Sequence, residues 1–156
     1  TGLRIVPIVR DEQVTVSVEL SDAYNDEVKE AIASGLRTTF TYDVELRRSV
    51  SVWFDRSLAS TAVIAAAQLD TLTGRFQVSR SVDGRIEDSR VSADRSDVAK
   101  FMTTFERLPL FSTGELEPNV EYVVRVRLRT RPRVNWFLWP FNRSDAAGFA
   151  RFALIP

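Results

Sequence analysis

The sequence predicts an α+β fold, mainly antiparallel β, that is β-sandwich-like with two short flanking helices. Apolar and polar residues alternate along most of the chain, as they do in strands with one buried face. Turn signals such as Asp83-Gly84 separate the alternating segments, and only two segments place apolar residues at helical spacing. With 156 residues, of which 44% are hydrophobic, the chain is long enough for one core. We therefore expect a single domain over residues 1–156.

The N-terminal segments predict a β-hairpin. Val14, Val16, Val18 and Leu20 alternate with polar residues. Leu3, Ile5 and Val9 mark the apolar side of the strand before them, and the four residues from Arg10 to Gln13 separate the two strands. Pro7 has no backbone N–H to donate, so the first strand is expected at the edge of its sheet.

A short amphipathic helix is expected after the hairpin. Ser21 and Asp22 are typical helix caps, and Gly35 suits the left-handed residue that follows a helix ending near Ser34. Its apolar positions are four residues apart: Tyr24, Val28 and Ile32. The apolar face should pack on a sheet.

The centre of the chain predicts four strands. The first runs from Leu36 to Phe54, about twice the usual length of five to six residues, so it should bulge near Arg47-Arg48-Ser49 or span two sheets. The other three are Thr61 to Leu69, Arg75 to Val82 and Arg85 to Val91, joined by turns at Asp70 to Gly74 and Asp83-Gly84.

A second helix and the last strands complete the predicted fold. Asp94 is its expected cap, and Pro109 should end it. Its apolar stripe is expected in the core: Val98, Phe101, Met102, Phe105 and Leu108. Strands should follow at Leu110-Phe111, at Val120 to Thr130 with the even positions inward, and at Phe149 to Ile155.

Composition excludes several kinds of chemistry. The chain contains no histidine and no cysteine, which excludes Ser-His-Asp and Cys-His hydrolases and the usual zinc sites within it. The formal net charge is zero, so no global basic field exists to hold nucleic acid. We expect no catalytic residue, no metal site, no cofactor and no nucleic-acid partner.

An arginine-rich strand is the first candidate binding surface. The odd positions from 125 to 133 are all arginine and should share one face: Arg125, Arg127, Arg129, Arg131 and Arg133. They could bind phosphate, lipid head groups or an acidic partner. Alternatively, they could pair across strands with Asp43 and Glu45, at about 0.2 to 1 kcal/mol for each pair.

An aromatic segment is the second candidate surface. It holds Trp136, Phe137, Trp139 and Phe141, separated by Leu138 and Pro140. Exposed, such a segment would form a large apolar patch of the kind that marks a protein or membrane contact. The alternative is that the C-terminal segment 134–156 folds back and closes the sandwich.

Several segments between Ser34 and Arg131 carry a resemblance to a known family. They are Ser34-Gly35-Leu36 with the strand Phe40 to Leu46, Trp53 to Arg56, Leu69 to Arg80, the second helix, Leu108 to Leu110, Leu116 to Pro118, and Tyr122 to Leu128. Together they resemble a bacterial exported family catalogued only as a domain of unknown function, DUF4390. Because its members usually carry an N-terminal signal or anchor, the resemblance implies a periplasmic or cell-envelope location. It implies no established activity and no catalytic residues, and the tail after Arg131 departs from the family's commoner form.

The leading functional hypothesis is a noncatalytic exported accessory or scaffold protein that docks on a larger envelope or membrane protein complex, with peripheral contact to the membrane. The alternative is a binding module for an acidic lipid or another amphipathic ligand held between the sheets. A carboxylate-dependent hydrolase, using pairs such as Glu87 and Asp88, is the weakest hypothesis.

Overall fold

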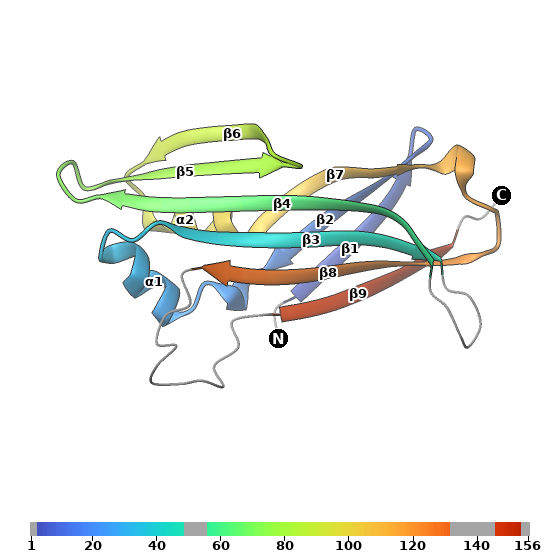
Figure 1. The fold of residues 1–156 in the computed structure, drawn as a ribbon, viewed down its shortest axis with the longest axis horizontal. Coiled ribbons are helices and arrows are strands. Elements are labelled where there is room, and N and C mark those ends of the chain that lie inside the picture. Colours follow the sequence, from blue (N-terminus) through green and yellow to red (C-terminus); the bar gives the residue numbers. More distant parts are fainter. Residues whose placement is uncertain (1–2, 49–55, 132–145, 154–156) are drawn as a thin grey trace.

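The computed structural model describes residues 3–48, 56–131 and 146–153, which form nine strands and two α-helices (Figure 1). Strands β1 (Leu3–Arg10), β2 (Gln13–Leu20) and β7 (Thr104–Ser112) form a sheet in the order β1-β2-β7. The second sheet has the order β6-β5-β4-β3-β8-β9, and its strands are β3 (Thr38–Arg48), β4 (Arg56–Asp70), β5 (Arg75–Val82), β6 (Arg85–Ser92), β8 (Glu121–Arg131) and β9 (Ala146–Ala153). The helices are α1 (Asp26–Ala33) and α2 (Arg95–Thr103).

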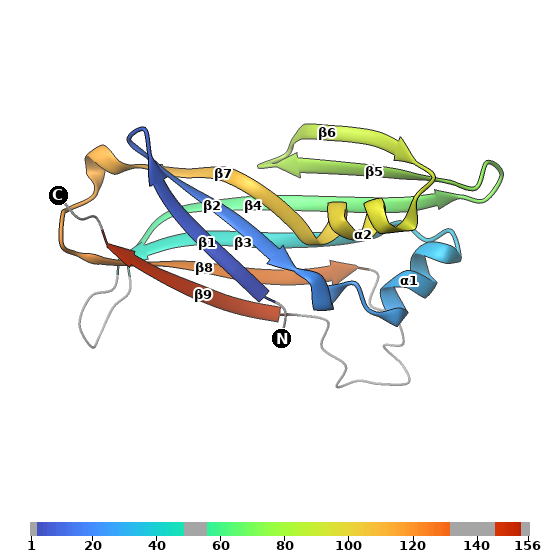
Figure 2. The same ribbon diagram turned by 180° about the vertical axis from the view of Figure 1, so that it is seen from behind.

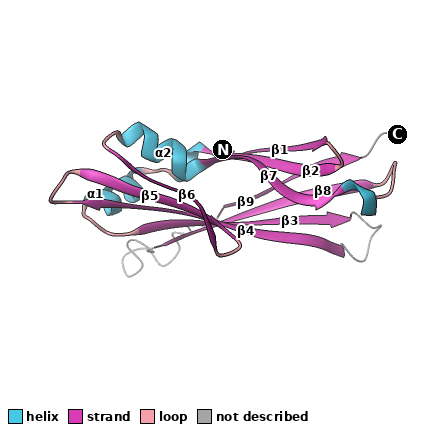
Figure 3. Cartoon of the chain, turned by 90° about the horizontal axis from the view of Figure 1, so that it is seen from above, coloured by secondary structure: helices cyan, strands magenta, loops and turns pink. Residues whose placement is uncertain are grey.

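The two sheets form separate layers, and the three-stranded sheet covers only part of the six-stranded one (Figures 2 and 3). Helix α2 leads directly into β7 and extends the smaller layer, while α1 packs against the ends of β3 and β4. Buried side chains from both sheets and both helices form one hydrophobic cluster. The neighbouring strands pair antiparallel in both sheets, which confirms the predicted β-sandwich-like fold with two short flanking helices.

The N-terminal hairpin is confirmed. Asp11 and Glu12 form its two-residue turn, and both have positive φ, at 51° and 61°. Strand β1 is an edge strand, as Pro7 predicted, and it pairs only with β2 among the described strands. The alternating residues of β2 from Val14 to Leu20 are buried.

The start of the first helix differs from the prediction. Residues Ser21–Ala23 form a separate 3-10 turn, and the cap of α1 is Asn25, whose side chain accepts a hydrogen bond from Val28 N at 3.0 Å. Capping by Ser21 or Asp22 is therefore wrong, because the turn uses these residues before the helix begins. The predicted end is confirmed by Gly35, which follows the helix with φ of +88°.

Strand β3 stays within the six-stranded sheet throughout its described length, so of the two predicted alternatives the structure confirms the bulge. Its pairing with β4 is irregular between Leu46 and Arg47, and this bulge lies where the alternating pattern breaks in the sequence. Residues 49–54 of the predicted strand lie outside the described residues. Strand β4 begins at Arg56, earlier than the predicted Thr61.

The second helix is shorter than predicted. Asp94 is its cap, as expected, but α2 ends at Thr103, so Phe105 and Leu108 belong to β7. Both side chains are buried, as the apolar stripe predicted. The helix does not extend to them because this segment pairs with β2 as a strand, with Pro109 opposite Thr15 and register shifts nearby.

Candidate functional site

One face of the six-stranded sheet points away from the layer formed by β1, β2, β7 and α2 (Figure 3). We call it the outer face and define it by the odd-numbered residues of β3, β8 and β9. In β8, and in β3 as far as Leu46, the even residues are buried whereas the odd ones are partly or fully exposed, because successive side chains of a strand point to opposite sides. The sequence predicted this orientation correctly for the arginine strand.

Four of the predicted arginines lie together on the outer face: Arg125, Arg127, Arg129 and Arg131. Strand β3 lies beside them, and its register places Glu45 opposite Arg125 and Asp43 opposite Arg127. The structure therefore brings the predicted arginines and the predicted carboxylates onto the same surface. Arg133 is a further predicted member, but it lies outside the described residues.

Only one of these arginines forms an ion pair with a described carboxylate. Arg129 donates to Asp43 through Nε at 2.9 Å and through a terminal nitrogen at 3.2 Å. Glu45 instead lies 3.7 Å from Arg47 of its own strand. Within the described part of the chain, Arg125, Arg127 and Arg131 have no ion-pair partner, so their charge is available to an outside group.

Phe149 on β9 adds an apolar group to the outer face. Its side chain is 66% exposed and lies opposite Arg125 in the strand register. The guanidinium of Arg151 lies 5.9 Å from the centre of the Phe149 ring, and Arg151 also contacts Glu121 at 3.5 Å. Phe149 was not predicted as a site residue. The signal in the sequence was its odd position two residues before Arg151, since both residues then lie on the same face of a strand.

The predicted aromatic site residues Trp136, Phe137, Trp139 and Phe141 lie outside the described residues. Of the predicted closing segment 134–156, the described part is β9, which pairs with β8 at the edge of the six-stranded sheet. The described part of this segment therefore completes the sheet that carries the arginines.

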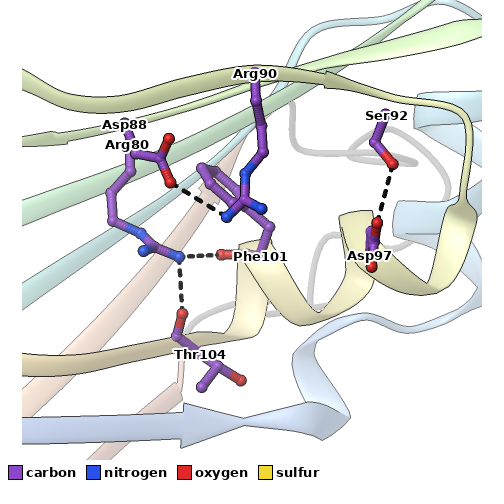
Figure 4. Close-up of polar contacts among 7 residues, drawn as sticks. All are labelled: Arg80, Asp88, Arg90, Ser92, Asp97, Phe101 and Thr104. Atoms are coloured by element: carbon purple, nitrogen blue, oxygen red, sulfur yellow. Dashed lines mark hydrogen bonds and ion pairs between the residues drawn. The ribbon is translucent and has the colours of Figure 1, made fainter.

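A separate arginine cluster lies on the inner side of the same sheet (Figure 4). Arg80 of β5 donates to the carbonyl oxygens of Phe101 and Thr104 at 2.7 and 2.8 Å, where α2 passes into β7. Its guanidinium lies 4.4 Å from the centre of the Phe101 ring, and Arg90 lies 5.0 Å from that ring centre. These contacts satisfy carbonyls that the end of the helix leaves without an intrahelical donor. The cluster therefore has a structural role: it attaches the end of α2 to β5.

The pKa values of the two side chains that hold the end of α2, Arg80 and Tyr42, are shifted by burial. Burial lowers the pKa of Arg80, and the nearby Asp88 carboxylate opposes that shift. Burial also raises the pKa of Tyr42, whose hydroxyl donates to the Met102 carbonyl at 2.6 Å. Arg80 keeps its charge because guanidinium pKa values lie far above neutral pH, and Tyr42 stays protonated. The end of α2 is thus held by two donors from distant strands.

Carboxylates do not gather in the described part of the chain: no group of three or more Asp or Glu residues there could hold a metal ion. Asp94 accepts a hydrogen bond from Ser96 N, and hydrogen bonds from Ser96 lower the pKa of its carboxyl group. Asp97 accepts a hydrogen bond from the Ser92 hydroxyl at 3.3 Å.

None of the described helices is both long and apolar enough to cross a bilayer.

A family model, described as a domain of unknown function (DUF4390), matches residues 4–133. The chain belongs to the DUF4390 family. No curated protein and no solved structure shows a significant match to it. The part that matches DUF4390 includes the whole of β8 and its arginines, whereas Phe149 and the aromatic segment lie beyond the matched residues. The arginine strand is therefore part of the DUF4390 domain itself.

Proposed function

We propose that this protein is a noncatalytic exported accessory or scaffold protein that docks on a larger envelope or membrane protein complex through its outer face. The observation that carries the proposal is the exposed Phe149 opposite Arg125. Arg125 and the neighbouring Arg127 lack carboxylate partners among the described residues, whereas Arg151 beside the Phe149 ring pairs with Glu121. Aromatic and arginine side chains are enriched at protein interfaces and at their energetic centres. The outer face therefore combines an apolar anchor with a charge that can orient a partner.

Charge favours an acidic partner surface. The outer face of β3, β8 and β9 carries Arg47, Arg125, Arg127, Arg129, Arg131 and Arg151 against the carboxylates Asp43, Glu45 and Glu121. The whole chain has a formal net charge of zero, so this excess is local. A local excess of this kind steers association with a complementary surface and selects against basic partners. The exported location rests on the resemblance to an exported family.

The decisive experiment is a pull-down of the tagged protein from its native membranes in mild detergent, followed by quantitative mass spectrometry. Stoichiometric recovery of a membrane complex is expected. The variant Arg125→Glu/Arg127→Glu should lose most of the complex, because it reverses the charge beside Phe149.

A matched control reverses two exposed arginines away from the outer face, Arg10→Glu and Arg85→Glu, at the ends of the β1-β2 and β5-β6 hairpins. The control should retain the complex. Recovery of the wild-type protein alone would overturn the docking function, and equal loss in both variants would overturn the assignment to the outer face.

The alternative functions stay hypotheses. An acidic lipid or amphipathic ligand held between the sheets would have to displace side chains such as Tyr42, Val44 and Val124, which form a buried core there. A carboxylate-dependent hydrolase would need two close carboxylates in a cleft. Docking through the outer face requires no such rearrangement, so the geometry supports it better.

A further inference from the structure

A groove lies between α1 and α2, on the side of the sheet opposite the outer face. Its volume is about 400 Å³. Ile32 and Phe76 are nearly fully buried and form its floor, while Ala33 of α1 and Ala99 of α2 line its walls. The small alanine side chains keep the two helices from filling the space between them. A groove of this size is near the lower end of the range for small-molecule sites, about 300 to 1,000 Å³.

The rim of the groove is cationic. Lys29 of α1 and Arg95 of α2 line it, and none of the lining residues is a carboxylate. Lys29 lies 3.9 Å from Asp26, but both side chains are largely exposed, so this contact is weak and easily exchanged. The groove therefore combines an apolar floor with positive charge at its opening.

Tyr24 contributes a neutral hydroxyl group to the same groove. Burial raises the pKa of Tyr24, and the positive charge of Arg95 partly opposes this shift. The hydroxyl is thus protonated at neutral pH and can donate a hydrogen bond near the guanidinium. Three donors of different geometry consequently surround the opening: an ammonium, a guanidinium and a phenol.

We propose that this groove binds a single-chain amphipathic carboxylate. The hydrocarbon chain would lie on Ile32 and Phe76, and the carboxylate would lie between Lys29 and Arg95. A guanidinium matches the two oxygens of a carboxylate in a bidentate arrangement. The modest volume favours one chain over two. This binding site is separate from the outer face, so it adds a ligand to the protein and does not depend on docking.

The test is isothermal titration calorimetry of the purified protein with three probes that share a ten-carbon chain: decanoate, decan-1-ol and decyltrimethylammonium. The two ionic probes are kept below their critical micelle concentrations and decan-1-ol below its solubility limit. Decanoate should bind saturably, and the neutral alcohol should bind at least roughly tenfold more weakly because it forms no charge-assisted hydrogen bonds. The cationic probe should not bind. Absence of decanoate binding, or equal binding of all three probes, would overturn the proposal.

Two variants locate the site. Lys29→Gln/Arg95→Gln should weaken decanoate binding roughly tenfold and leave decan-1-ol unchanged, whereas Ala99→Phe should block both probes by filling the groove. The control Lys100→Gln/Arg85→Gln removes the same charges from other exposed positions and should bind like the wild type. Matching thermal unfolding curves would show that each variant is folded. Unchanged decanoate binding in the charge variant would place the ligand elsewhere and overturn the assignment.

Discussion

Arg129 binds Asp43 in a bidentate ion pair, although the residue directly opposite Asp43 in the strand register is Arg127. The pair is diagonal because the long arginine side chain extends along the sheet surface. Long side chains can span the distance between diagonal neighbours on adjacent strands. As a result, Asp43 pairs with Arg129, and among the described residues Arg127 has no carboxylate partner. Arg127 therefore stays available for binding, together with Arg125 and Phe149.

Asp43→Asn should therefore affect binding more than folding. Its ion pair is about half exposed on both sides, so its loss should lower the free energy of unfolding by less than about 1 kcal/mol. The released Arg129 adds positive charge to the outer face, so capture of the membrane complex should increase. Urea unfolding and the quantitative pull-down measure the two effects. Reduced capture would contradict an acidic partner surface.

Arg80→Met should destabilise the fold strongly. The change leaves the Phe101 and Thr104 carbonyls without their donor, and hydrogen bonds to charged groups contribute about 1.5 to 3 kcal/mol each. With both bonds on one partly buried side chain, we expect a loss of roughly 2 to 4 kcal/mol in urea unfolding. Arg90→Met is the matched control: Arg90 contacts the same Phe101 ring but is exposed, so its loss should cost below about 1 kcal/mol. Equal losses would refute the role of Arg80 at the end of α2.

Tyr42 should make stability fall at alkaline pH. Burial raises its pKa above the ordinary tyrosine value of about 10, so the folded protein keeps a proton that the unfolded chain releases. This contribution is complete below about pH 10 and is lost as the pH rises through the folded pKa. Tyr42→Phe should flatten the decline in unfolding free energy between about pH 10 and about pH 12, whereas Tyr24→Phe, at a less buried site, should retain most of it. An unchanged slope in Tyr42→Phe would be inconsistent with this account.

Gly148→Ala should weaken the packing between β9 and β1. A Cβ atom at this position would clash with the Leu3 side chain, so Leu3 would have to move. Overpacking of this kind costs about 1 to 3 kcal/mol, measurable by thermal or urea unfolding. Leu3→Ala should offset part of the loss when the two changes are combined. Gly114→Ala, whose Cβ would approach only the Ser112 Oγ at 3.8 Å, is the control with little effect; strictly additive losses for Gly148 and Leu3 would argue against the clash.

Local patterns predicted the strands and their faces well. The even residues of β8 are buried and its arginines point outward, because the two-residue period of a strand is set by the backbone alone. Turns that require positive φ could also be predicted from the sequence: Asp83 and Gly84 both have positive φ in the hairpin between β5 and β6. The cap of α2 at Asp94 was also visible, because it depends on neighbouring residues only.

Element boundaries that depend on distant contacts were predicted less well. Phe105 fits the helical stripe of α2, yet it lies in β7 because β2 pairs with that segment and Arg80 and Tyr42 hold the helix end at earlier carbonyls. Likewise, Phe149 could be assigned to a strand, but its exposure depends on its position at the sheet edge beside β8.

Alternating residues, tight turns and side chains that share a strand face can all be recognised in the amino-acid sequence, because these properties follow from backbone geometry over a few residues. Three features could be recognised only in the folded protein: β8 lies between β3 and β9, Arg129 rather than Arg127 binds Asp43, and α1 and α2 leave a groove between them. These features arise from packing between segments far apart in the chain, where many arrangements share the same local pattern and burial of one common core selects among them.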